Sequence, residues 1–143
     1  MSGARFSVAS WNVNSIKVRL PQVTAWLEQV GPDVLLLQEL KGTAFPEEAF
    51  TPLGYQTAAV AQKAYNGVAL LSRRPFTVER RALPGDPDDL QARYLEATVG
   101  DLRIASLYLP NGNPVASDKY PYKLRWLARL ERHVRDLLAG EQP

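Results

Sequence analysis

Residues 32–39 read Pro-Asp-Val-Leu-Leu-Leu-Gln-Glu, a short apolar run with turn residues before it and a carboxylate at its end. An apolar run of this length predicts a strand buried on both faces. Glu39 would then stand at the C-terminal tip of a core strand, where loops commonly carry reacting groups. A single acid at a strand end more often faces solvent, so Glu39 gains meaning only from its neighbours.

The segment before this run predicts a strand followed by a helix. Residues 5–12 alternate apolar and small polar side chains, as a half-buried strand does. An apolar stripe with helical spacing follows, and Gly31 and Pro32 supply the stop. Its members are Pro21, Val23, Trp26, Leu27 and Val30. We expect Pro21 in the first turn of this helix, where a missing amide hydrogen costs little.

The segment after the run predicts a short helix, five strands and a long helix. The short helix covers about residues 46–53, and residues 84–89 form a surface turn. The extended runs are residues 55–61, 67–72, 77–83, 94–99 and 102–109, and the last helix covers about 118–138. This order predicts an α+β unit with a mostly β layer and helices packed on one face.

The amino-acid composition excludes several kinds of functional site. The 143 residues include no cysteine, so disulfides, thiolate metal sites and cysteine nucleophiles are excluded. The formal net charge of +2 is too small to indicate nucleic-acid binding by itself, although Arg and Lys side chains cluster at 73–81 and 119–135. No apolar stretch resembles a signal peptide or a membrane span. We therefore expect a cytoplasmic protein.

Asn12 and Tyr108 share with Glu39 a position at the C-terminal tip of an expected strand. An amide at such a tip usually caps a turn, and a tyrosine usually packs its ring and exposes its hydroxyl. Together, however, an amide, an acid and a phenol at one sheet edge could hold a hard cation and a phosphate oxygen. The three residues define a candidate site.

Four segments resemble, in order, the signature blocks of the exonuclease III/AP endonuclease family, within the endonuclease/exonuclease/phosphatase superfamily. They are residues 11–14 (Trp-Asn-Val-Asn), 32–41 (ending Gln-Glu-Leu-Lys), 66–72 (beginning Asn-Gly-Val) and 108–112 (Tyr-Leu-Pro-Asn-Gly). The resemblance covers nearly the whole chain and matches only the N-terminal half of the family. It implies that residues 1–143 form the N-terminal half of one domain, which is half of a four-layer α/β-sandwich with one mostly antiparallel sheet and two main helices on its outer face. It also implies a bacterial-type, nucleoid-associated location.

The resemblance also implies a role for each matched position. Glu39 would bind Mg²⁺, with Mn²⁺ as a possible substitute, while Asn12 would lie beside the metal and Tyr108 would contact the scissile phosphate. Residues near the DNA backbone would be Lys63, Tyr65, Asn66, Arg93, Asn111 and Lys123. Such donors fix phosphates without reading sequence. The substrate would be double-stranded DNA with abasic sites or 3′ ends, cleaved in DNA repair.

The family's remaining catalytic blocks, an Asp-x-Asn, a later Asp and a Ser-Asp-His, have no counterpart in these residues. His133, the only histidine, matches none of them and is expected on the surface. The chain alone should therefore be nearly inactive. We expect this chain to leave the inner face of its sheet uncovered, so that the missing C-terminal half or a second copy covers it.

Two other functions remain open from the sequence. One is a nucleic-acid-binding or regulatory relative that keeps the fold without catalysis, although such a protein would not need Asn12, Glu39 and Tyr108 together. The other is a sister phosphatase that acts on inositol phosphates or sphingomyelin. The segment at residues 108–112 and the basic last helix favour DNA.

Overall fold

Two β-sheets and two long helices make up residues 5–140, the part of the chain that the computed structural model describes. The strands are β1 (Val8–Asn12), β2 (Val34–Gln38), β3 (Gln56–Val60), β4 (Val68–Ser72), β5 (Phe76–Arg80), β6 (Tyr94–Val99) and β7 (Leu102–Leu107). The helices are α1 (Ile16–Val30) and α2 (Lys119–Ala139), with two short 3-10 turns, η1 (Glu47–Ala49) and η2 (Thr51–Leu53). The expected order of elements is confirmed.

The first sheet has the strand order β1-β2-β4-β3, with β1 parallel to β2 and the other pairs antiparallel. Every residue of β2 is buried, as the apolar run predicts. Leu35 and Leu37 pack in the cluster under α1, while Val34 and Leu36 pack on the opposite face. Both faces of β2 are covered, which is why its sequence shows no alternation.

The second sheet, β5-β6-β7, corrects the expectation of a single sheet. The chain leaves β4 through a turn at residues 73–75 and enters a separate antiparallel layer. In β6, Leu95 and Ala97 face the first sheet, whereas Tyr94 packs towards α2. The periodicity of the sequence marks the strands, but it does not say which strands pair.

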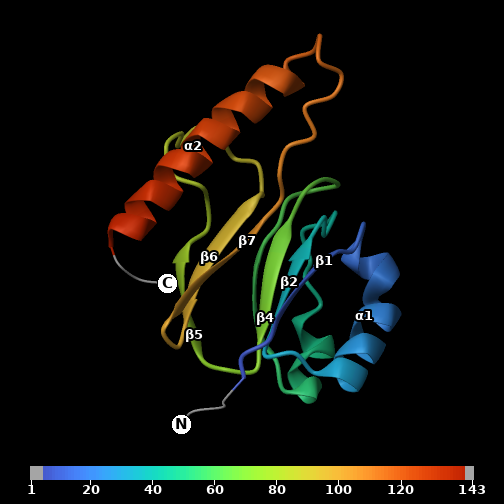
Figure 1. Ribbon diagram of the computed structural model, residues 1–143. Coiled ribbons are helices and arrows are strands. Elements are labelled where there is room, and N and C mark those ends of the chain that lie inside the picture. Colours follow the sequence, from blue (N-terminus) through green and yellow to red (C-terminus); the bar gives the residue numbers. More distant parts are fainter. Residues whose placement is uncertain (1–4, 141–143) are drawn as a thin grey trace.

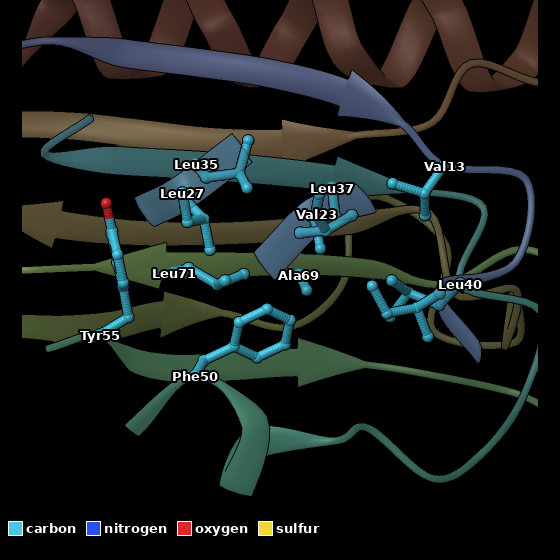
Figure 2. Close-up of a cluster of buried hydrophobic side chains, with 11 residues drawn as sticks. Val13, Val23, Leu27, Leu35, Leu37, Leu40, Phe50, Tyr55, Ala69 and Leu71 are labelled. Carbon is cyan, nitrogen blue, oxygen red and sulfur yellow. The ribbon is translucent and has the colours of Figure 1, made fainter. Parts of the chain in front are cut away.

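The four layers run α1, first sheet, second sheet, α2, so each main helix covers a different sheet (Figure 1). Figure 2 shows the cluster beneath α1, where Val23 and Leu27 meet Leu71 of β4 and Phe50 beside η1. A second cluster fills the space between the sheets. The inner face of the first sheet is therefore covered by the chain itself, and the expectation that it is exposed is wrong.

Helix α1 begins earlier than its apolar stripe suggests. Ser15 is its N-cap, and the Ser15 hydroxyl accepts a hydrogen bond of 3.2 Å from the Val18 amide. We expected Pro21 in the first turn, but it lies inside the helix. Because proline has no amide hydrogen, one interior backbone hydrogen bond is missing. The expected helix at residues 46–53 is instead the pair of 3-10 turns η1 and η2.

Helix α2 packs on the outer face of the second sheet through Trp126 and His133. His133 is only 5% exposed, which corrects its expected surface position. Its Nε2 lies 2.6 Å from Oε1 of Glu96, a fully buried acid on β6. The contact with Glu96 across the helix–sheet interface thus explains why His133, the only histidine in the chain, is buried.

Neither helix in the described part of the chain is both long and apolar enough to cross a membrane.

Candidate active site

The tips of β1, β2 and β7 lie at one end of the two sheets. Asn12, the last residue of β1, pairs in register with Gln38, the last residue of β2, and Glu39 follows directly. Tyr108 follows β7, and its amide donates a 2.8 Å hydrogen bond to the carbonyl of Arg93, the residue before β6. The edge expected from the sequence therefore carries Asn12, Glu39 and Tyr108 together.

Tyr108 and Glu39 contact each other directly, although 69 residues separate them in sequence. The Tyr108 hydroxyl donates a 2.9 Å hydrogen bond to Oε1 of Glu39. Burial raises the pKa of Tyr108, and its bond to the Glu39 carboxylate raises it further. The phenol consequently stays protonated at neutral pH and remains a hydrogen-bond donor.

Asn12 caps the turn that follows β1. Its Oδ1 accepts a 3.2 Å hydrogen bond from the Asn14 amide, the usual role of an amide at a strand end. The Asn14 side chain in turn accepts a hydrogen bond from the Lys41 ammonium group. Asn12 is therefore beside Glu39 by strand register, with its side chain exposed and its oxygen bonded within its own turn.

The backbone around these tips adopts an unusual conformation. Glu39 and Lys41 both have a φ of 58°, and Asn66, on the loop before β4, has a φ of 57°. Non-glycine residues adopt this left-handed region at a cost, and such strain often concentrates at functional sites. A hydrogen bond of 2.9 Å from the Lys41 amide to the Asn66 carbonyl holds the two loops together.

Gln38 belongs to the matched block at residues 32–41, but the sequence did not reveal its structural role. It is 8% exposed and donates from Nε2 to Ser10 on β1 and Ser106 on β7, at 3.1 and 3.3 Å. The Ser106 hydroxyl also donates a 3.0 Å hydrogen bond to the Leu37 carbonyl. These bonds join the two sheets just below Glu39 and Tyr108. Small serines in alternating strands give no signal of such a link.

A cavity of about 800 Å³ opens beside Tyr108. Its lining is rich in amides, phenols and cations, and consists of Gln62, Tyr65, Asn66, Gln91, Arg93, Tyr108, Pro110, Asn111, Gly112, Asp118, Lys119, Tyr122 and Arg125. Four expected DNA-backbone residues, Tyr65, Asn66, Arg93 and Asn111, line this cavity. Three basic side chains face one acid there, which suits an anionic ligand.

The two other expected backbone residues lie outside that lining. Lys123 packs against the turn at Gly112, where an added Cβ on the glycine would lie only 2.7 Å from the Lys123 Cδ. Lys63 is exposed on the loop after β3, and its carbonyl accepts a 2.8 Å hydrogen bond from the Tyr65 amide. Both remain near the cavity through their neighbours, and their roles stay predictions.

The donor set fits a divalent cation only in part. Mg²⁺ in proteins commonly takes one or two carboxylates and completes its shell with water and phosphate oxygens. Glu39 offers one carboxylate at the sheet edge, but residues 5–140 contain no cluster of three or more acidic or histidine side chains that could hold a metal. Glu39 thus suits one protein ligand of an incomplete site.

Two facing sheets between two helix layers, with an acid, a phenol and a cavity lined by cationic and amide side chains at one end, define an α/β-sandwich with a candidate site at its strand tips. Residues 9–143 match the model of the endonuclease/exonuclease/phosphatase family, and the chain belongs to that family. Exodeoxyribonuclease III of Haemophilus influenzae is 37% identical over 132 residues, which cover 87% of this chain and 49% of that relative.

Solved structures agree with this assignment. A 3′ phosphatase from Neisseria, bound to a product DNA hairpin, matches with a TM-score of 0.91 and 42% identity over 94% of this chain and 53% of that one. An AP endonuclease from Archaeoglobus fulgidus matches with a TM-score of 0.87 and 36% identity, over 92% of this chain and 52% of that one. The chain therefore spans about half the length of these relatives, and they place it in the exonuclease III/AP endonuclease branch.

Proposed function

We propose that this chain supplies the N-terminal half of a Mg²⁺-dependent DNA-repair nuclease of the exonuclease III type. The substrate would be duplex DNA with an abasic site or a 3′ end. The observation that carries the proposal is the bond between Tyr108 and Glu39 at a strained sheet edge, beside a cavity lined by Arg93 and Asn111. Similarity to a phosphatase bound to a DNA hairpin and to an AP endonuclease supports DNA as the substrate.

Each residue would have a distinct task. Glu39 would hold the cation with one carboxylate oxygen while Tyr108 donates to the other. The protonated Tyr108 phenol would also reach a phosphate oxygen, and Asn12 would orient a neighbouring polar group. When bound, Mg²⁺ would neutralise charge that develops on the phosphate.

The cavity residues would hold the DNA backbone. Arg93, Asn66 and Asn111 line the cavity, and guanidinium and amide groups donate hydrogen bonds to phosphate oxygens. Lys63, Tyr65 and Lys123 would extend this contact along the strand. These contacts fix the position of the duplex without reading its sequence.

The chain alone should cleave poorly. Among the described residues, Glu39 is the only acid that hydrogen-bonds to Tyr108, and His133 is buried beneath α2 on the other side of the second sheet. Residues 5–140 contain no group of three or more acidic or histidine side chains that could hold a metal ion, so the rest of the cation site and the group that activates water would come from a complementary half. Positioning without those groups gives little acceleration.

We further propose that a complementary C-terminal half attaches along the open edges of both sheets. β1 and β7 are terminal strands in their sheets, each with a single neighbour among the described strands. Open strand edges are templates for further pairing. In addition, α2 exposes four apolar side chains that are 36–70% exposed and share one flank of the helix by their spacing, namely Leu124, Leu127, Val134 and Leu138.

Binding and cleavage should separate in the purified chain. In low salt with Mg²⁺, a labelled duplex containing an abasic-site analogue should bind, while cleavage of a natural abasic duplex stays near background. Arg93→Gln should weaken binding and reduce its salt dependence by about one phosphate contact. Arg125→Gln, at the rim of the same cavity, gives a matched charge change whose effect should be smaller.

Two results would contradict this proposal. The first is tight binding of an inositol phosphate with no binding of DNA. The second is efficient cleavage of abasic DNA by the chain alone, since residues 5–140 would then suffice for catalysis. A 3′-phosphate hairpin, tested in parallel, distinguishes phosphatase from endonuclease activity.

A further inference from the structure

We infer that Tyr122 is a positioning residue that holds Arg93 against Tyr108, so that the guanidinium group is fixed at the mouth of the phosphate cavity. The inference rests on the proposed function for the ligand, but the geometry is independent of it. Tyr122 belongs to α2, whereas Arg93 precedes β6 and Tyr108 follows β7. Three separate segments therefore meet at one cation.

Arg93 lies between two aromatic rings. Its guanidinium carbon is 5.0 Å from the centre of the Tyr108 ring and 5.7 Å from the centre of the Tyr122 ring. Its Nη1 donates a 3.2 Å hydrogen bond to the Tyr108 carbonyl, and its Nε donates a 2.8 Å bond to Gln91. A cation over an aromatic face is attracted by the electron density of the ring. Two rings and two hydrogen bonds leave Arg93 little freedom.

Tyr122 is itself anchored. Its hydroxyl donates a 2.7 Å hydrogen bond to Oδ2 of Asp89, which also accepts a 2.8 Å bond from Nη1 of Arg129. The Asp89 side chain is only 7% exposed, although it belongs to a loop that reads as a surface turn. Burial raises the pKa of Asp89, but the bonds from Arg129 and Tyr122 outweigh it and leave the pKa below its ordinary value. Asp89 therefore stays ionised at neutral pH and keeps both donors.

Arg129 secures the other end of this chain of contacts. Its Nη2 donates a 2.7 Å hydrogen bond to the Leu83 carbonyl, and its Nε donates a 3.2 Å bond to the Pro84 carbonyl. The loop between β5 and β6 is thereby fixed to α2, and Tyr122 with it. This arrangement extends from Arg129 through Asp89, Tyr122 and Arg93 to Tyr108.

The consequence for binding is pre-organisation. An unrestrained arginine loses rotamer freedom when it meets a phosphate, and that loss reduces affinity. A guanidinium already held between Tyr108 and Tyr122 loses less. Removal of the Tyr122 ring should therefore weaken phosphate binding, although Tyr122 need not touch the phosphate.

Nuclear magnetic resonance of the chain tests the geometry without DNA. The Arg93 Nε–H signal, assigned by its loss in Arg93→Gln, should exchange slowly with water in the wild type. In Tyr122→Leu the signal should shift and exchange several-fold faster, and Tyr122→Phe, which keeps the ring and loses the bond to Asp89, should be intermediate. Tyr120→Leu, an exposed tyrosine on the same helix, should leave the signal unchanged.

A double-mutant cycle tests the effect on binding. Tyr122→Leu should weaken binding of the abasic-analogue duplex by about fivefold, and it should add almost nothing in a chain that already carries Arg93→Gln, because contacting residues couple. Unfolding free energies of all variants exclude loss of fold as the cause.

The outcomes separate the two proposals. An Arg93 signal unchanged in Tyr122→Leu would overturn the positioning role. Additive losses in the double mutant would overturn it as well. If the wild-type chain binds no DNA, the proposed function fails, while the exchange rate of the Arg93 signal still decides whether Tyr122 positions it.

Discussion

At the scale of single residues, the fold buries ionisable side chains that no sequence pattern predicts to be buried. Glu96 is fully buried on β6, and its carboxylate accepts hydrogen bonds from Tyr94 at 2.7 Å, His133 at 2.6 Å and Arg103 at 2.5 Å. Buried carboxylates are tolerated only when such partners satisfy them. The network joins α2 to the second sheet and explains the burial of His133.

Replacement of Glu96 should lower the free energy of unfolding, because it removes the acceptor of this hydrogen-bond network. Burial raises the pKa of Glu96, but the bonds from His133, Tyr94 and Arg103 outweigh it, so the folded-state pKa lies below the ordinary 4.5. Glu96 therefore stabilises the fold above pH 4.5 and loses this contribution as pH falls through its folded-state pKa. Glu96→Gln should cost about 3 kcal/mol in urea unfolding at pH 7.

The difference between wild type and Glu96→Gln should narrow below pH 4.5. Glu79→Gln, on the neighbouring strand β5, is the matched control and should cost less than about 1 kcal/mol because Glu79 is exposed. A difference that stays constant with pH would show that Glu96 is not ionised in the folded protein.

The sequence predicts some site residues and cannot predict others. Glu39 and Tyr108 are detectable because each follows a clear strand pattern and matches a family block. The contacts of Gln38, Asp89 and Tyr122 are not detectable, because their partners lie on distant segments and no local pattern encodes them. Hydrogen bonding between distant residues becomes visible only in three dimensions.

At the scale of elements, the loops at the strand tips depend on close backbone approach. Gly67, just before β4, has a φ of +99°, and a Cβ there would meet the Leu40 Cβ at 2.8 Å. Its carbonyl accepts a 3.2 Å hydrogen bond from the Leu40 amide. The glycine thus lets the loop before β4 approach the segment that follows Glu39.

Gly67→Ala should destabilise the fold and disturb the site. Positive φ and overpacking against Leu40 together should cost about 2–4 kcal/mol in the free energy of unfolding. Gly42→Ala has no positive φ and meets nothing within 4 Å, so it should change stability by less than about 0.5 kcal/mol. Equal effects of the two substitutions in urea titrations would refute the close-packing account.

Element type is more predictable from this sequence than element arrangement. The run at residues 34–38 predicts β2 correctly, because a strand buried on both faces must be continuously apolar. The division of strands between two sheets was not predictable, because alternation in β6 is the same whichever layer it faces. The predicted start of α1 was wrong because it relied on Pro21, whereas the N-cap Ser15 lies six residues earlier.

At the scale of the whole molecule, residues 5–140 fill the space between their four layers but leave sheet edges unpaired. Clusters under α1, between the sheets and under α2 contain all the buried apolar residues of this part of the chain except Ala92. The outer edges of the terminal strands β1 and β7 are unpaired within residues 5–140, and the apolar flank of α2 is exposed. This surface is where we propose that the complementary half attaches.

The isolated chain should associate weakly through this surface. We expect sedimentation velocity to show a concentration-dependent increase in mass, because exposed apolar flanks and open strand edges promote pairing. Leu127→Ser with Val134→Ser should reduce association without lowering the free energy of unfolding by more than about 1 kcal/mol, since both are exposed. A chain that stays monomeric at high concentration would argue against an attachment surface here.

Glu39 and Tyr108 are proposed to form the cation end of a phosphate site. Mn²⁺ titration of the ¹⁵N-labelled chain tests this proposal, because the paramagnetic ion broadens the amide signals nearest to it. We predict that broadening begins at the amides of Asn12, Glu39 and Tyr108 and is lost in Glu39→Gln. Broadening centred on the acidic loop at residues 86–89, or unchanged in Glu39→Gln, would contradict the account.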